Sequence, residues 1–251
     1  MPAIELSRLR VQIRQLATRF DDPAAFSGEL RDFLDQHANR AYRPGVVVRP
    51  QLLLPSYRVA PLIMRELEIE LIRLSQEQPE PALQSVKILW AEEADLETRR
   101  LASIMLGAIP ASQAGAVIEV LRGLARPEEN FRMLEFLFED GTTTLRHQQP
   151  SALLALAEEW IGSSSLQVQA LGVRVLIPLI ADESFQNLPP IYRLLSSLVQ
   201  QVPGSLQADL QAATKALVDR SPAETAFFFR QVLPMAQGQA TARLVRHFLP
   251  K

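Results

Sequence analysis

Residues 82–109 read ALQSVKILWAEEADLETRRLASIMLGAI, and residues 152–179 read ALLALAEEWIGSSSLQVQALGVRVLIPL. Each segment holds two stretches of apolar residues at helical spacing, with a polar turn between them. The segments are 70 residues apart, which is about two helix pairs of 35 residues and close to the length of common helix-pair repeats. The matched apolar positions are Trp90, Leu96, Leu101, Met105, Leu106 and Ile109, followed by Trp160, Leu166, Leu171, Val175, Leu176 and Leu179.

This spacing predicts a stack of amphipathic hairpins, because a hairpin with one apolar face can bury it only against its neighbours. Leucine and alanine dominate the composition and only 10 of 251 residues are glycine, which also favours helix. We therefore predict an all-α fold, an α-solenoid of about six HEAT-like antiparallel helical hairpins in a right-handed superhelical array. The expected helices cover residues 4–20, 23–37, 58–77, 80–91, 95–109, 112–125, 128–139, 150–161, 165–181, 188–202, 205–219, 222–235 and 238–249.

We expect one continuous domain over residues 1–251. It begins with a helix pair (1–38) and ends with the stacked hairpins (58–251). Residues 39–57 form an irregular connector between them, because its prolines and its glycine interrupt any helix. A short extended segment, VVV at 46–48, fits within this connector.

Composition excludes several classes of protein. The net charge of −2 argues against a strongly cationic nucleic-acid binder and against a disordered chain. The chain has no cysteine, so disulfides, iron–sulfur ligation and thiol catalysis are excluded. Charges at Glu5, Arg8 and Arg10 exclude a secretory signal, and no apolar run approaches the roughly 20 residues that span a bilayer. We expect a cytoplasmic protein without membrane contact.

Common cofactor and metal motifs are also absent. No two glycines lie closer than eight positions, so no dinucleotide fingerprint or phosphate-binding loop can form locally. His37, His147 and His247 have no partner at helical zinc spacing, and we expect neither a metal nor a cofactor. An acidic cluster at the start of the helix expected at 95–109 is interpreted as interacting with the helix dipole. Its members are Glu92, Glu93, Asp95 and Glu97.

Arginines are concentrated in one part of the chain. No acid occurs between Gln36 and Arg65, and tyrosines are interleaved with the arginines there. The guanidinium group suits phosphate, since it donates two parallel hydrogen bonds. One interpretation is therefore a patch that contacts the DNA backbone, and the other is a solvated connector that carries arginines. The arginines are Arg40, Arg43, Arg49, Arg58 and Arg65.

The LW pair at 89–90, followed by Glu97, Arg99 and Ala102, resembles the LW…E-x-R-x-x-A pattern of the DNA alkylation repair family, the HEAT-like-repeat DNA glycosylases. The segment LPSYR at 54–58 and the helix pair around Trp160 are similar to further hairpins of that family. The resemblance covers residues 40–185. It rests mostly on core positions of hairpins, so it concerns the fold more than the activity.

The resemblance implies a shallow concave site in which aromatic side chains and a carboxylate handle a damaged base, with an arginine on the DNA. Matching this chain to the family places the carboxylate at Glu135 and one aromatic at Phe131. The carboxylate would stabilise the positive charge on the sugar as the base leaves. This chain departs from the family pattern by having glutamate for aspartate, Asn130 for a second aromatic and Ala170 for the arginine, with Arg174 one turn later.

The residues themselves allow two interpretations of Glu135. It stands one turn after Phe131 on the border of an apolar stripe, so it is either an acid with a functional role or an edge residue whose head group reaches water. Two functional hypotheses follow. The first is a non-catalytic repeat protein that binds a protein or double-stranded DNA on its concave face. The second is a DNA glycosylase that hydrolyses the N-glycosidic bond of alkylated bases. The oligomeric state stays open.

Overall fold

The computed structural model describes residues 5–39, 55–91, 95–232 and 234, and every regular element in those ranges is a helix. The prediction of an all-α fold is therefore confirmed. The contacts divide the chain into two compact units, Met1–Leu124 with Asn130–Thr144 and Ala125–Glu129 with Leu145–Lys251. The expected single continuous domain stays a prediction.

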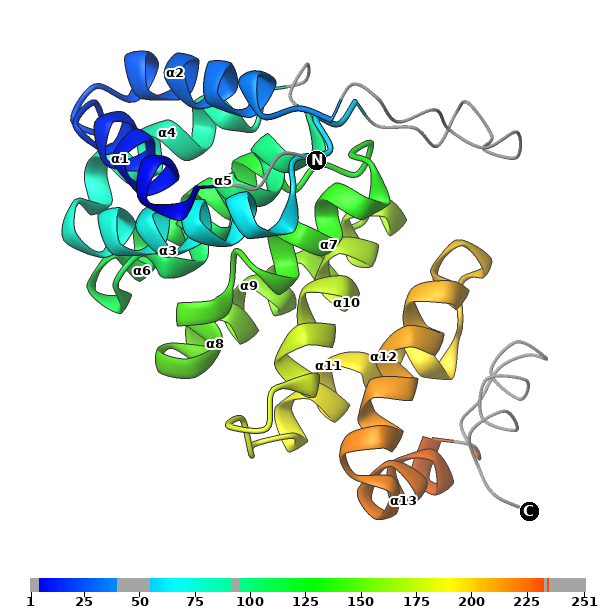
Figure 1. The fold of residues 1–251 in the computed structure, drawn as a ribbon. Coiled ribbons are helices and arrows are strands. Elements are labelled where there is room, and N and C mark those ends of the chain that lie inside the picture. Colours follow the sequence, from blue (N-terminus) through cyan, green and yellow to red (C-terminus); the bar gives the residue numbers. More distant parts are fainter. Residues whose placement is uncertain (1–4, 40–54, 92–94, 233, 235–251) are drawn as a thin grey trace. The chain divides into compact units, whose positions relative to one another are not determined.

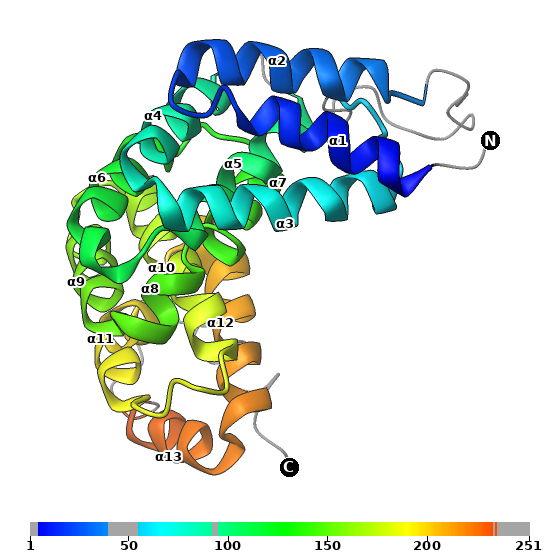
Figure 2. The ribbon, with the colours of Figure 1, turned by 60° about the vertical axis from the view of Figure 1, so that its left-hand side comes forward.

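The first unit is built around α3 (Pro61–Glu77) and α5 (Leu96–Ala108), which pack against each other (Figure 1). Helix α1 (Leu6–Ala17) lies along α3, as Figure 2 also shows, and an ion pair of 2.8 Å between Arg10 and Glu66 joins the two helices. The remaining elements are α2 (Pro23–Gln36), α4 (Pro79–Leu89), the 3₁₀ turn Ala111–Gln113, α6 (Ala114–Leu124), α7 (Phe131–Glu139) and the first residues of α8 (Thr143–Gln148).

Helix α5 is the centre of this unit. It packs against α3, α4 and α7, and Leu101 and Met105 are completely buried. Helix α3 is buried along one stripe only, at Ile63, Leu67 and Leu71. This is the amphipathic pattern of a helix with one face on the core.

Local signals explain where these helices begin. The Asp22 side chain accepts hydrogen bonds from the backbone of Ala24 and Ala25, which caps α2 as an aspartate before a proline should. Helix α7 begins at Phe131 and not at the expected residue 128, because the Asn130 side chain caps it by accepting from the Arg132 backbone at 2.9 Å.

The second unit is centred on α10 (Leu166–Ala181), which packs against α9 (Pro150–Ile161) and α12 (Gln207–Arg220). Gly172 lets α9 and α10 approach closely, since a Cβ there would lie 2.9 Å from the Ile161 backbone nitrogen. The other elements of this unit are α11 (Pro189–Gln200), the 3₁₀ turn Gly204–Leu206 and α13 (Pro222–Val232).

The apolar positions matched at a spacing of 70 residues lie in the helix pairs α4–α5 and α9–α10, except that Trp90 and Ile109 directly follow α4 and α5. Both tryptophans are buried, with 5% of Trp90 and 6% of Trp160 exposed. Four of the other matched pairs are also buried on both sides, whereas Leu166, the counterpart of Leu96, is exposed.

Other sequence predictions have mixed outcomes. The expected helices between residues 4 and 235 are confirmed to within a few residues at each end. The short helix α8 is an addition that the sequence pattern does not predict. The helix expected at 238–249 and the VVV segment at 46–48 lie outside the described residues.

Within the described ranges, no single helix is long and apolar enough to cross a membrane, although the bent pair Leu96–Ala108 and Ala111–Leu124 meets the length and composition criteria when taken together.

Candidate functional site

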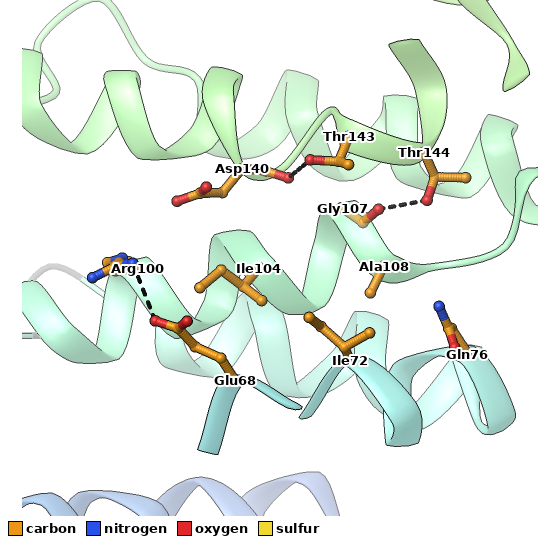
Figure 3. A pocket seen from close by; sticks show the side chains of 10 residues that line it. All are labelled: Glu68, Ile72, Gln76, Arg100, Ile104, Gly107, Ala108, Asp140, Thr143 and Thr144. Carbon is orange, nitrogen blue, oxygen red and sulfur yellow. Dashed lines mark hydrogen bonds and ion pairs between the residues drawn. The ribbon is translucent and has the colours of Figure 1, made fainter. Parts of the chain in front are cut away.

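Two hollows of about 780 and 340 Å³ adjoin in the first unit, between α3, α5 and the residues where α7 ends and α8 begins. They share Glu68, Arg100 and Asp140, and together we name them the α3–α5–α7 groove. Figure 3 shows the smaller hollow. The larger one is further lined by Val59, Met64, Arg65, Glu97, Arg132, Phe136 and Glu139, and the smaller one by Ile72, Gln76, Ile104, Ala108, Thr143 and Thr144.

An ion pair marks the place where the two hollows join. Nη2 of Arg100 on α5 lies 3.1 Å from Oε1 of Glu68 on α3, and the two side chains point toward each other in Figure 3. The Arg100 side chain is 44% exposed and that of Glu68 23%. The pair is thus open to a ligand, and its two charges offset each other.

At one wall of the smaller hollow, the main chain of α5 at Gly107 lies directly against the main chain at Asp140. A Cβ on Gly107 would lie 1.9 Å from the carbonyl oxygen of Asp140, so only glycine fits at this point of α5. The Thr144 hydroxyl also donates a hydrogen bond of 2.6 Å to the carbonyl oxygen of Gly107. These contacts hold α5 against the start of α8.

Helix α3 has a second apolar stripe that faces solvent. Leu62 is 40% exposed, Ile69 57% and Ile72 37%, and Ile72 lines the smaller hollow. Arg65 lies between them on the same face and lines the larger hollow. We name Leu62, Arg65, Ile69 and Ile72 the α3 stripe. Exposed aliphatic side chains that gather beside a groove mark an interaction surface more often than scattered ones do.

The carboxylate of Glu97 fastens the turn before α3 to the start of α5. It accepts hydrogen bonds from the Ser56 hydroxyl at 2.7 Å, the Tyr57 backbone at 3.1 Å and the Arg58 backbone at 2.7 Å. The backbone of Leu96 also donates to the carbonyl oxygen of Pro55 at 2.9 Å. Glu97 is 8% exposed, and its charge is directed to this turn and not to a ligand in the groove.

Tyr57 is part of the same arrangement. Burial of its phenol, together with a hydrogen bond to Asp95, raises its pKa to about 12. The tyrosine is therefore a neutral hydrogen-bond donor at physiological pH and unsuited to act as a general base.

The residues implied by the family resemblance lie on the surface of α7. Phe131 is 56% exposed, and the side chain of Glu135 is 38% exposed and forms an ion pair of 3.0 Å with Arg132. Arg132 also lies over the ring of Phe136, 4.9 Å from its centroid. Neither Phe131 nor Glu135 is among the residues that line the groove, whereas Arg132 and Phe136 are.

The predicted DNA-contacting arginines fall into three groups: those outside the described residues, those of the first unit and that of the second unit. Arg40, Arg43 and Arg49 lie outside the described residues, and the backbone of Arg58 is bound to Glu97. Arg65 lines the groove. Arg174 belongs to the second unit and forms two hydrogen bonds with Asp209, at 2.7 and 3.3 Å.

In the part of the chain that the structure describes, no group of three or more His, Asp or Glu side chains is placed to hold a metal ion. His147 pairs instead with Asp182, with 2.9 Å between Nε2 and Oδ2.

Sequence reasoning singled out Arg65 but missed most of the other residues that line the groove. The signal for the α3 stripe is nevertheless present, because α3 carries Leu62, Ile69 and Ile72 in addition to its buried apolar stripe. Glu68 and Arg100 are separated by 32 positions on different helices, and no local pattern connects them.

No known protein family, curated protein or solved structure matches the sequence. The function proposed below therefore rests on the groove and its surroundings.

Proposed function

We propose that the protein is a non-catalytic HEAT-like α-solenoid that binds another protein in the α3–α5–α7 groove. The helix pairs α4–α5 and α9–α10, whose matched positions are 70 residues apart, support the repeat part of this proposal. Repeat proteins of this type usually bind partners along extended surfaces made by successive helix pairs.

The observation that carries the proposal is the exposed α3 stripe beside the groove. Ile69 alone is 57% exposed, and burying the exposed part of this side chain on binding stabilises a complex by about 1–2 kcal/mol. A protein partner would use this apolar surface, whereas the phosphate backbone of DNA offers it nothing comparable.

The charged residues that line the larger hollow also favour a protein partner over nucleic acid. This hollow is lined by Arg65, Arg100 and Arg132 and by the acids Glu68, Glu139 and Asp140, in addition to Glu97, whose charge is bound to the turn at residues 56–58. Surfaces that bind nucleic acid collect basic residues on one face, because affinity comes largely from neutralised phosphates. A lining with both signs of charge suits a protein with complementary side chains of both signs.

The glycosylase hypothesis makes a separate prediction. It requires Glu135 to approach the sugar of a flipped nucleotide, and the ion pair with Arg132 would have to open for this. A working glycosylase should release a methylated base from duplex DNA, and Glu135→Ala should abolish the release. Absence of release by the wild-type protein in large enzyme excess would exclude this hypothesis.

The proposal is tested by comparing two kinds of ligand on the full chain. A displayed library of random peptides is selected on the wild-type protein, and the selected peptides are measured against Ile69→Asp. We expect affinities at least tenfold weaker for this variant, and unchanged ones for Phe227→Asp, a substitution at a 60% exposed aromatic residue of the second unit.

The second arm of the test uses labelled double-stranded DNA in a salt titration. We expect no specific binding at physiological salt. Tight binding that weakens steeply with salt, together with peptides that do not distinguish Ile69→Asp from wild type, would overturn the proposal in favour of DNA.

A further inference from the structure

Resting on the proposed function, we infer that the groove's partner is an amphipathic α-helix that places aliphatic side chains along Leu62, Ile69 and Ile72 and an acidic side chain against Arg65. The spacing of the three aliphatic residues in the α3 stripe indicates a helical partner. The positive charge of Arg65, in the same stripe, indicates an acidic residue on that partner.

The spacing of the stripe suits a helix better than an extended chain. With a rise of 1.5 Å per residue, Leu62 and Ile69 are about 10.5 Å apart along the axis of α3, and Ile69 and Ile72 about 4.5 Å. A second helix lying along α3 has the same distances between its residues i, i+7 and i+10. Side chains on one face of an extended peptide repeat every 6.8 Å or so, which matches neither interval.

A helix that binds in a groove also needs a hollow beside the stripe that can receive one of its side chains. Ile72 continues into the smaller hollow, where Ile104 and Ala108 add apolar surface on α5. One aliphatic side chain of the partner can enter there, while its neighbours rest on Ile69 and Leu62. Apolar anchors on one face of an amphipathic helix are the usual means of such recognition.

Arg65 is a groove residue whose charge is held by no hydrogen bond within the described residues, although it interacts electrostatically with Glu66, the ion-pair partner of Arg10. Unlike its neighbours, it has no hydrogen bond or ion pair with any residue in the described ranges. Arg100 is bound to Glu68, Arg132 to Glu135, and Glu97 to the turn at Ser56–Arg58. An acidic side chain on the partner would therefore gain a new ion pair at Arg65 without breaking an existing one.

The experiment uses a displayed library of alanine-rich helical peptides in which one face is randomised among aliphatic, acidic, basic and polar residues. It is selected on the full-length protein and, in parallel, on Arg65→Glu. We expect wild type to enrich aliphatic residues at i, i+7 and i+10 with an acid at i+3, or, for a peptide bound in the opposite direction, aliphatic residues at i, i+3 and i+10 with an acid at i+7. Arg65→Glu should enrich lysine or arginine at that position instead.

Matched measurements on one selected peptide complete the test. Arg65→Glu should weaken its binding roughly fivefold, the worth of about 1 kcal/mol, and a basic residue in place of the peptide's acid should restore it. Lys87→Glu makes the same change of charge on α4, where Lys87 is exposed and does not line the groove, and should leave the affinity unchanged. Circular dichroism should show helix gained on binding.

The outcomes separate the two proposals. Peptides that depend on Ile69 but lack helical period, or whose acid preference survives Arg65→Glu, would overturn the helix inference and leave groove binding intact. No enriched peptide, or enriched peptides that bind Ile69→Asp as well as wild type, would overturn both. A dimer of the protein that Ile69→Asp dissociates would show that a second copy of the chain occupies the stripe, and would also overturn the inference.

Discussion

Glu97 accepts a 2.7 Å hydrogen bond from the backbone of Arg58, a residue 39 positions earlier whose φ of 54° lies in the left-handed region. That conformation costs a non-glycine residue roughly 1–2 kcal/mol. The three hydrogen bonds to the Glu97 carboxylate offset the cost, and they connect the turn before α3 with the first turn of α5.

Glu97→Ala should destabilise the protein by about 3 kcal/mol, since it leaves the backbone donor of Tyr57 without its acceptor and leaves that of Arg58 only the longer bond of 3.2 Å to the Ser56 hydroxyl. Glu97→Gln keeps one carbonyl oxygen and should cost less. Urea unfolding followed by circular dichroism measures both changes. Arg58→Gly removes the backbone strain and serves as the comparison. A loss of stability as large as that of Glu97→Ala would contradict this account of the turn.

Gly107→Ala should destabilise the first unit by about 3 kcal/mol or more, because the new methyl group would collide with the main chain at Asp140, which has little freedom to move. Gly115→Ala is the matched control. Gly115 lies in helix α6, is exposed, and a methyl group added there would meet no atom within 4 Å, so alanine should stabilise the helix by about 0.5–1 kcal/mol. Thermal unfolding of the two variants should therefore shift in opposite directions.

Tyr57 should titrate late, with a pKa of about 12 against an ordinary value near 10. The folded state holds this proton more tightly than the unfolded state, so stability is unaffected below about pH 10 and falls as the pH rises from there toward the folded pKa. Tyrosinate absorbance measures the titration. Tyr57→Phe should remove the late component, and Asp95→Asn should move it to lower pH.

Arg174 and Asp209 should behave as a structural pair. Either single alanine substitution should destabilise the protein by about 2 kcal/mol, since the side chain of Asp209 is only 8% exposed and that of Arg174 25%. The double substitution should cost clearly less than the sum of the two single ones. Strictly additive losses in urea unfolding would speak against this role, and for an Arg174 that is available to another ligand.

The fold could be predicted from the sequence because its signals are local. Apolar residues at helical spacing, prolines at first helical positions and the Asp22 cap each act within a few residues, and the helices follow them closely. Helix α8 escapes such prediction because it depends on a distant contact. It is six residues long, and Thr144 near its start bonds to Gly107, 37 positions earlier.

The candidate site could be predicted only in fragments, because it is assembled from helices far apart in the sequence. The LPSYR segment and the E-x-R-x-x-A pattern are separate signals in the sequence, and the structure joins them through Glu97 and the backbone of Tyr57 and Arg58. The family resemblance points to Glu135. Side-chain packing instead places Arg132 and Phe136, from the same helix, at the groove.

The hydrogen bond between Asn39 and Tyr57 shows where the chain could be altered experimentally. The backbone of Asn39 donates to the carbonyl oxygen of Tyr57 at 2.9 Å, so the chain leaves the C-terminal end of α2 and returns to a neighbouring point. The entropy of closing a loop between fixed ends changes only slowly with its length, by about 0.6 kcal/mol for each doubling. A variant shortened between Asn39 and Pro55 therefore changes the closing entropy only slightly, and its thermal unfolding would measure what residues 40–54 contribute to stability. A shortened variant would lack Arg40, Arg43 and Arg49, and comparing its affinity for DNA with that of the full chain would isolate their contribution in one step.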